Sequence, residues 1–154
     1  MTGGASVDDW FSLDHHCEVP MTSRIASCCC GQLNIEVQGE TLGAGVCHCL
    51  ACQRRTGSVF AALAAYAAPW KANGAATEYV RTGDAGASFR FRFCPICGST
   101  VFHTEEGNDD CVMVAVGAFA DPAFPPPQDS VYECRRHAWV QLPEGIARYE
   151  KDPD

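Results

Sequence analysis

Seven of the chain's 11 cysteines lie in three short groups whose spacing is typical of metal ligands. The groups follow the patterns C-x-C, C-x-C-x-x-C and C-x-x-C, and in chain order they are Cys28 and Cys30, then Cys47, Cys49 and Cys52, then Cys94 and Cys97. Such spacing lets neighbouring sulfurs converge on one ion, while a glycine such as Gly31 or Gly98 after the last cysteine relieves the turn. Soft thiolates favour zinc, with iron or an iron–sulfur cluster as the lesser possibility.

Seven ligands cannot fill two four-cysteine sites, so the pattern predicts one closed site and one open site. Cys47, Cys49 and Cys52 lie within six consecutive residues, and keeping them together is the simplest partition by local geometry. The other four then form a closed tetrahedral site: Cys28, Cys30, Cys94 and Cys97. A four-thiolate zinc is structural, whereas a three-thiolate zinc keeps a position for water or substrate. The sequence leaves open whether His48 completes the second site.

The four cysteines outside these groups are predicted to be small buried core residues, as free cysteines often are: Cys17, Cys29, Cys111 and Cys134. An odd cysteine count argues against complete disulfide pairing. Residues 1–24 are acidic and contain no continuous apolar run, so they do not resemble a secretory signal. We therefore expect a cytoplasmic protein whose cysteines are reduced and bind metal.

Length and charge narrow the class of protein further. The 154 residues suit one domain, which we place at residues 24–150 between an N-terminal tail, 1–23, and a C-terminal tail, 151–154. The longest apolar stretch, residues 59–68, is too short for a membrane span. With 11 Lys and Arg against 19 Asp and Glu, the net charge is −8, which disfavours nucleic acids and anionic membranes as partners.

The dominant hydrophobic period is two, which predicts half-buried strands and an all-β fold. Apolar and polar residues alternate over residues 33–38 and 88–93. Five further stretches between turn signals are predicted strands: residues 59–66, 77–80, 100–103, 111–116 and 131–134. Residues 50–55 predict one helical turn that needs an anchor, and the four prolines of residues 121–128 predict an extended connector.

Three motifs in order resemble one known family. They are C-x-C-G, then C-H-C-x-x-C-Q-R-x-T-G-S, then F-C-x-x-C-G-S followed by a strand. This order resembles the family of the glutathione-dependent formaldehyde-activating enzyme, which includes centromere protein V, over residues 25–149. The resemblance implies a single-domain, tent-like β-sandwich with zinc-binding knuckles. It also implies a structural zinc on Cys28, Cys30, Cys94 and Cys97 and a catalytic zinc on Cys47, Cys49 and Cys52, the partition that spacing favours.

The resemblance further implies a carbon–sulfur lyase that forms S-(hydroxymethyl)glutathione from glutathione and formaldehyde. A thiol at the open zinc would be held as a thiolate, and the partners would be a small thiol such as glutathione and an aldehyde. Because three thiolates on Zn²⁺ leave a charge of −1, nearby cations are needed, and Arg54 and Arg55 are the candidate substrate-binding residues. An exchangeable second zinc would be only partly occupied. The roles of His103 and His137 stay open.

Two other functions are compatible with the same residues. A zinc-stabilised binding module would use both metals structurally and carry out no catalysis. Alternatively, Cys47, Cys49 and Cys52 could serve redox chemistry or metal storage. The open site favours the enzyme, because a purely structural second zinc would need a fourth ligand that the motif does not provide.

Overall fold

The computed structural model describes residues 22–153 and consists mainly of β-strands. Two sheets form the fold, and neither closes into a barrel: a three-stranded sheet with the order β1-β2-β5 and an eight-stranded sheet with the order β11-β10-β3-β4-β9-β8-β7-β6. The strands are β1 (Ser23–Ser27), β2 (Asn34–Gln38), β3 (Gly43–Cys47), β4 (Ala61–Ala67), β5 (Trp70–Asn73), β6 (Thr77–Thr82), β7 (Ser88–Phe93), β8 (Thr100–Glu105), β9 (Cys111–Ala115), β10 (Asp129–Val131) and β11 (Ala147–Arg148). One α-helix, α1 (Leu50–Thr56), and two 3-10 turns, η1 (Val116–Phe119) and η2 (Glu133–Arg135), complete the described chain.

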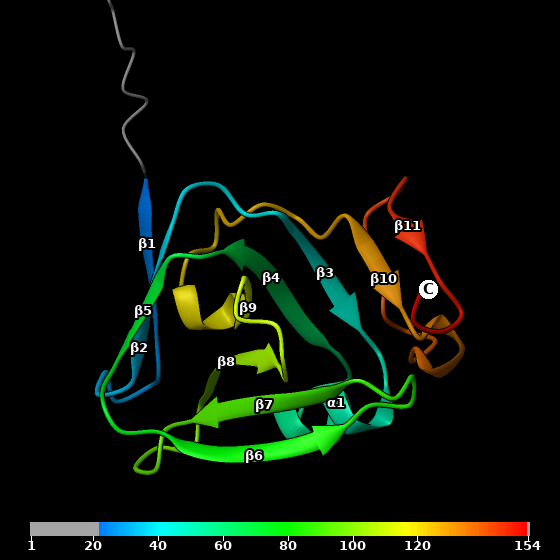
Figure 1. The fold of residues 1–154 in the computed structure, drawn as a ribbon. Helices are drawn as coiled ribbons and strands as arrows, with labels where there is room; N and C mark the ends of the chain where they lie inside the picture. Colours follow the sequence, from blue (N-terminus) through cyan, green and yellow to red (C-terminus); the bar gives the residue numbers. More distant parts are fainter. Residues whose placement is uncertain (1–21, 154) are drawn as a thin grey trace, which may run out of the picture.

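The two sheets enclose one apolar core. The small sheet stands apart on the left in Figure 1, while the large sheet bends from β10 and β11 through β3 and β4 to β6 and β7. Alternation along β2 buries Ile35 and Val37 completely, as the period of two predicts. They belong to the same buried cluster as Tyr66 of β4, Phe102 of β8 and Val114 of β9. The small sheet therefore covers one face of the large one.

The opposite face of the large sheet carries a different set of side chains. Since side chains alternate between faces, the neighbours of the core residues point away from the core. Register places Ala65, Met113, His103 and Phe91 in one row across β4, β9, β8 and β7. All four line one pocket. The alternation thus divides the large sheet between a core face and a pocket face.

Most predicted elements are confirmed, and one is wrong. Strands occur at all the other predicted stretches, the helical turn is α1, and residues 121–128 contain no strand or helix. The predicted strand over residues 131–134 is wrong, because β10 ends at Val131 and η2 follows. The backbone of Tyr132 turns the chain there with a φ of 59°, which lies outside the strand region. Residues 1–21, which hold most of the predicted N-terminal tail and Cys17, lie outside the described residues.

Within residues 22–153, no helix is long and apolar enough to cross a bilayer. The mostly β fold agrees with the β-architecture that the resemblance implies.

The turn after β5 is held against the turn after β1 by the side chain of Gln32. The Gln32 amide donates to the carbonyl of Ala75 at 2.7 Å and to Cys94 Sγ at 3.0 Å, and its oxygen accepts from the backbone N–H of Ala75 at 3.0 Å. Gly74 has a φ of +91°, and a Cβ at this position would lie 1.8 Å from the carbonyl oxygen of Gln32. The close approach needs glycine for both reasons.

We expect Gly74→Ala to lower the free energy of unfolding by about 2 to 4 kcal/mol, since it adds a backbone clash to the cost of a positive φ. Gly86→Ala is the matched control, because Gly86 has a φ of +95° and nothing within 4 Å of an added Cβ. That control should cost about 1 kcal/mol. Urea unfolding of the reduced, zinc-loaded variants measures both values, and equal losses would contradict the contact.

Candidate metal centres

Two matching turns bring the first four cysteines together. Cys28 follows β1, and Cys94 follows β7. In each turn the backbone N–H of this first cysteine donates across the turn: Cys28 N–H to Leu33 O at 2.8 Å, and Cys94 N–H to Ser99 O at 3.0 Å. Gly31 and Gly98, with φ values of 80° and 75°, allow both turns to close. The predicted role of these glycines is confirmed.

The four sulfurs of these turns form a compact group, in which all ligand atoms lie within 4.8 Å of one another: Cys28, Cys30, Cys94 and Cys97. Cys30 Sγ lies 3.6 Å from both Cys28 Sγ and Cys94 Sγ. Sulfurs bound tetrahedrally to zinc at about 2.3 Å stand about 3.8 Å apart, so the spacing suits a zinc ion. A disulfide would need a sulfur–sulfur separation of about 2.05 Å. The donor set therefore fits zinc.

Hydrogen bonds also prepare these sulfurs to carry negative charge. The N–H groups of Leu33 and Ile96 donate to Cys28 Sγ at 3.3 Å and to Cys94 Sγ at 3.4 Å. The Ser99 hydroxyl, 3.4 Å from Cys97 Sγ, lowers the pKa of the Cys97 thiol to about 5. Donors to sulfur stabilise the thiolate, which is the form that binds metal.

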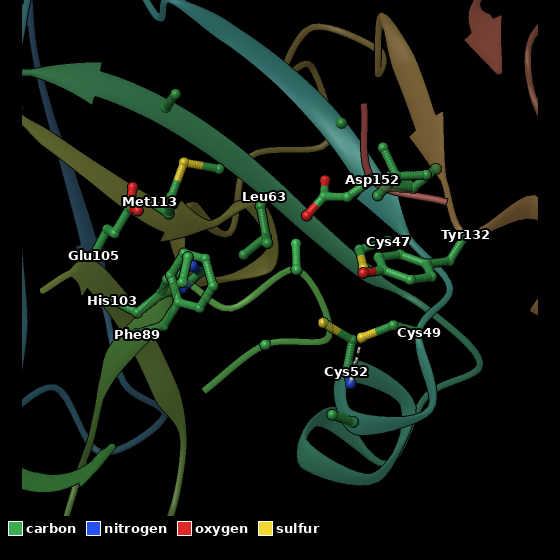
Figure 2. A pocket seen from close by; sticks show the side chains of 18 of the residues that line it. Cys47, Cys49, Cys52, Leu63, Phe89, His103, Glu105, Met113, Tyr132 and Asp152 are labelled. Carbon is green, nitrogen blue, oxygen red and sulfur yellow. Dashed lines mark hydrogen bonds between the residues drawn. The ribbon is translucent and has the colours of Figure 1, made fainter. Parts of the chain in front are cut away.

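The second group of sulfurs combines the end of a strand with the first turn of a helix. Cys47 is the last residue of β3, Cys49 is the N-cap of α1, and Cys52 lies within α1. Their sulfurs also lie within 4.8 Å of one another. The N–H of Cys52 donates to Cys49 Sγ at 3.3 Å, and Figure 2 shows the three side chains converging. Hydrogen bonds from Cys47 and then from Cys52 lower the pKa of the Cys49 thiol.

Helix α1 is too short to be stable alone; the Gln53 side chain anchors it to neighbouring segments, and Gly57 ends it. Gln53 donates from its side chain to His48 O at 2.8 Å and to Arg135 O at 3.1 Å, and its oxygen lies 3.1 Å from His137 Nε2. At the other end, Gly57 adopts a left-handed conformation and its N–H donates to Gln53 O. Gln53 was not among the predicted site residues, although the C-Q-R-x-T-G-S motif contains it.

His48 does not join the sulfurs. Its ring is fully buried and meets Phe60 edge-on, with ring centroids 5.8 Å apart. The group of three cysteines has no histidine as a fourth member among the described residues. The alternative of His48 as a ligand therefore finds no support in the geometry.

The two candidate arginines take different positions. Arg55 Nη2 lies 3.9 Å from Cys52 Sγ, and its guanidinium carbon lies 4.7 Å from the centre of the Phe91 ring. Arg54 is exposed and lines the pocket, and its side chain has no hydrogen-bond or ion-pair partner within residues 22–153. Arg55 can thus offset the charge of the thiolates, while Arg54 is free to meet a ligand.

The three cysteines open onto a pocket of about 760 Å³ over the pocket face of the large sheet. In Figure 2 the cysteines lie at one end and Phe89, His103 and Met113 at the other, with Leu63 between them. The arginines Arg81 and Arg135 also line this pocket, but Asp84 pairs with both, at 3.7 and 3.0 Å. Arg54 is therefore the unpaired cation of the pocket among the described residues.

Three acidic or phenolic side chains near the cysteines were not predicted as site residues. Asp129, Tyr132 and Asp152 line the pocket, and Figure 2 shows the Tyr132 ring beside the cysteines and the Asp152 carboxylate pointing toward Leu63 in the middle of the pocket. Burial raises the pKa of the Asp129 and Asp152 carboxyls. No local spacing links these residues to the motif. Asp152 lies in the segment that the sequence predicts to be a tail.

The remaining cysteines correct one prediction. Cys29 and Cys134 are exposed and Cys111 is half-buried, so the prediction of buried core residues is wrong for Cys29 and Cys134. Cys29 lies between Cys28 and Cys30, whose sulfurs belong to the four-cysteine group, and Cys134 lies in η2. Cys17 lies outside the described residues.

Two other basic side chains lie in ion pairs or beside the helix. Arg90 of β7 pairs with Glu78 at 2.6 Å and with Glu106 at 2.8 Å. His137 meets Trp139 edge-on and contacts Gln53, so it supports the helix anchor. His103 is buried and lines the pocket.

One of three comparisons with known proteins, a match to a protein family, agrees with the cysteine pattern. Residues 23–135 match the protein family described as glutathione-dependent formaldehyde-activating enzyme. No curated protein matches the chain. Among solved structures, the crystal structure of a Rhodobacter sphaeroides protein is 24% identical, with a TM-score of 0.48 and a match that covers 81% of this chain and 98% of that one.

We expect the reduced chain to bind two zinc ions, one at each cysteine group. A competing chelator should remove the ion of the three-cysteine group first, because that group provides only three protein ligands. Cys52→Ser should bind one ion and stay folded. Cys97→Ser should lower the Tm by several degrees, because the four-cysteine site that contains Cys97 joins two distant turns.

Metal analysis, chelator kinetics and thermal unfolding measure these outcomes. Cys134→Ser is the control, because Cys134 is exposed and lies outside both groups. Retention of both ions by Cys52→Ser, or loss of one by Cys134→Ser, would contradict the assignment.

Proposed function

The chain belongs to the family of the glutathione-dependent formaldehyde-activating enzymes, and from that premise we propose that it is a carbon–sulfur lyase working in the synthetic direction. It binds a thiol such as glutathione at a zinc ion on Cys47, Cys49 and Cys52 and adds it to formaldehyde or a related aldehyde. One observation carries the proposal: three converging thiols, with no fourth protein ligand among the described residues, open onto a large pocket.

The four-cysteine group has a different part in this proposal. Its sulfurs come from the turns after β1 and β7, and amide and hydroxyl groups already donate to them. A closed four-thiolate zinc has no free position for a ligand. We assign it a structural role, and both sites need the reduced cysteines that a cytoplasmic location would preserve.

When bound, zinc supplies one chemical effect at the open site, which is to keep a fourth thiol deprotonated at neutral pH. The protein must then moderate the negative charge, since three thiolates on a divalent ion already leave −1. Arg55 is placed to do this, at 3.9 Å from Cys52 Sγ and packed on Phe91. A cation beside the sulfurs lowers the cost of gathering a further anion.

The addition itself moves one proton and changes no oxidation state. The sulfur forms a bond to the carbonyl carbon, the carbon–oxygen π bond breaks, and the oxygen receives the proton that the thiol released. Asp129 and Asp152 face this pocket with raised carboxyl pKa values, so either can carry that proton. Holding both reactants in one pocket supplies the proximity that accelerates the step.

Binding of a thiol at the open site can be tested with cobalt in place of zinc. We expect glutathione to change the thiolate-to-cobalt absorption of the reduced protein, because its sulfur enters the coordination sphere. S-methylglutathione is the matched control and should have no effect, since it carries the same charged groups without a thiol. An unchanged spectrum with glutathione and with smaller thiols would contradict the open-site mechanism and favour the binding module.

Arg54 is the proposed contact for a carboxylate of the thiol substrate. Arg54→Gln should raise the KM for a carboxylate-bearing thiol about two- to fivefold, as expected for an exposed ion pair, with little change in kcat. Arg90→Gln is the matched control, because Arg90 forms ion pairs with Glu78 and Glu106 and does not line the pocket. Steady-state kinetics over both substrates measures the difference, and equal KM values for the two variants would remove Arg54 from the site.

A further inference from the structure

The pocket extends well beyond the cysteines, and its far end is apolar. In Figure 2, Phe89, His103 and Met113 lie opposite the cysteines, and Leu63 lies between the two ends. Leu63, Phe89 and Met113 are half-buried, so part of each side chain faces the pocket. Formaldehyde is far too small to use this space, and apolar surface of this kind favours an apolar ligand.

The far end of the pocket offers no unpaired cation that could bind a charged ligand among the described residues. Arg81 and Arg135 are paired with Asp84, and the unpaired Arg54 belongs to α1, at the cysteine end. Glu105, which also lines the far end, is exposed. A carboxylate placed there would find no free cation among the described residues and would lie near an acidic group.

One buried polar group interrupts the apolar surface. His103 is only 6% exposed, and its Nδ1 has no hydrogen-bond partner within the described residues. Its ring lies 4.6 Å from the Phe91 ring and 5.8 Å from the Phe89 ring, measured between centroids. Burial, with a smaller effect from the charge of Arg55, lowers the pKa of His103 to about 3, so the imidazole is neutral. Because Nδ1 is itself fully buried, a ligand in the pocket meets the ring at Nε2, which is not fully buried and has no hydrogen bond within the described residues. A polar atom in an apolar pocket favours a ligand that supplies its hydrogen-bond partner.

We propose that the far end of this pocket binds an uncharged, mainly apolar group of the substrate, about the size of an aromatic ring, and that the His103 imidazole hydrogen-bonds to a polar substituent such as a hydroxyl on that group. The inference rests on the proposed function and refines it, because it gives one of the two reactants an apolar substituent. That substituent belongs to the thiol or to the aldehyde. It accounts for the apolar far end of the pocket, which formaldehyde and a thiol held at the cysteine end do not explain.

Occupancy of the far end can be observed directly through Met113. The other two methionines, Met1 and Met21, lie in the first 21 residues, and Met113→Leu identifies the Met113 methyl signal in protein labelled at methionine methyl groups. In the zinc-loaded protein, benzyl mercaptan or benzaldehyde should shift this signal through the ring current, whereas 2-mercaptoethanol and formaldehyde should not. A Met113 signal that neither aromatic probe moves would overturn the proposal.

Affinity measurements separate the two sources of the apolar group. If the thiol carries it, benzyl mercaptan should bind the cobalt form at least about tenfold more tightly than 2-mercaptoethanol, the smallest gain expected for burying a phenyl ring. If the aldehyde carries it, benzaldehyde should show that gain over formaldehyde in kcat/KM with glutathione as the thiol. Absence of a gain in both comparisons would overturn the proposal.

The role of His103 is tested by a hydroxyl group on the probe. The native protein should bind 3-hydroxybenzaldehyde more tightly than benzaldehyde, and His103→Phe should lose this difference while it keeps affinity for benzaldehyde. His103→Gln should restore part of it, which a purely structural role would not do. Persistence of the hydroxyl preference in His103→Phe would remove His103 from the proposal.

These experiments also distinguish the inference from the function on which it rests. If glutathione changes the cobalt spectrum but an aromatic ring adds no affinity, the inference fails and the proposed function stands. If no thiol changes the spectrum but benzaldehyde shifts the Met113 signal, the proposed reaction fails and the apolar binding site stands.

Discussion

The convergence of four cysteine sulfurs from two distant turns is the interaction on which the rest of the structure depends. Cys28 and Cys30 belong to the turn that follows β1 of the small sheet, while Cys94 and Cys97 belong to the turn that follows β7 of the large sheet. Gln32 adds a third segment, since it bonds both to Cys94 Sγ and to the turn after β5. One metal-sized cluster therefore joins the ends of both sheets and orients the core between them.

A second constraint gives the two faces of the large sheet different roles: one packs in the core, and the other lines the pocket. Because side chains alternate strictly between the faces of a strand, burying Tyr66 and Val114 against the small sheet requires Ala65 and Met113 to face the other way. The pocket is thus the reverse side of the core. The cysteines of the open group lie at one end of the pocket, because Cys47 is the last residue of β3 and Cys52 lies in α1. The core and the pocket therefore use opposite faces of the same strands.

Local sequence patterns were sufficient where the relevant contacts are local. The spacing of Cys47, Cys49 and Cys52 predicted their convergence, because one strand end and one helical turn contain all three. The prediction of a strand at residues 131–134 was wrong because the backbone conformation of Tyr132 is not encoded in an alternation of apolar residues. The predicted burial of Cys29 and Cys134 was wrong because composition does not reveal which side of a turn a residue faces.

The sequence by itself determined the type, number and grouping of the cysteines in the three motifs and the alternation that produces the sheets. These features depend on residues two to five positions apart, so spacing is enough to predict them. That the first and third cysteine groups meet in one cluster of four was a prediction that only the tertiary structure could decide, since they lie more than 60 positions apart. Only the tertiary structure decided that Arg55 meets Cys52 over the Phe91 ring, that Gln53 anchors the helix to Arg135, and that His103 and Asp152 share one pocket with the cysteines. Most of these contacts join residues dozens of positions apart, and the folding of one sheet over the other brings them together.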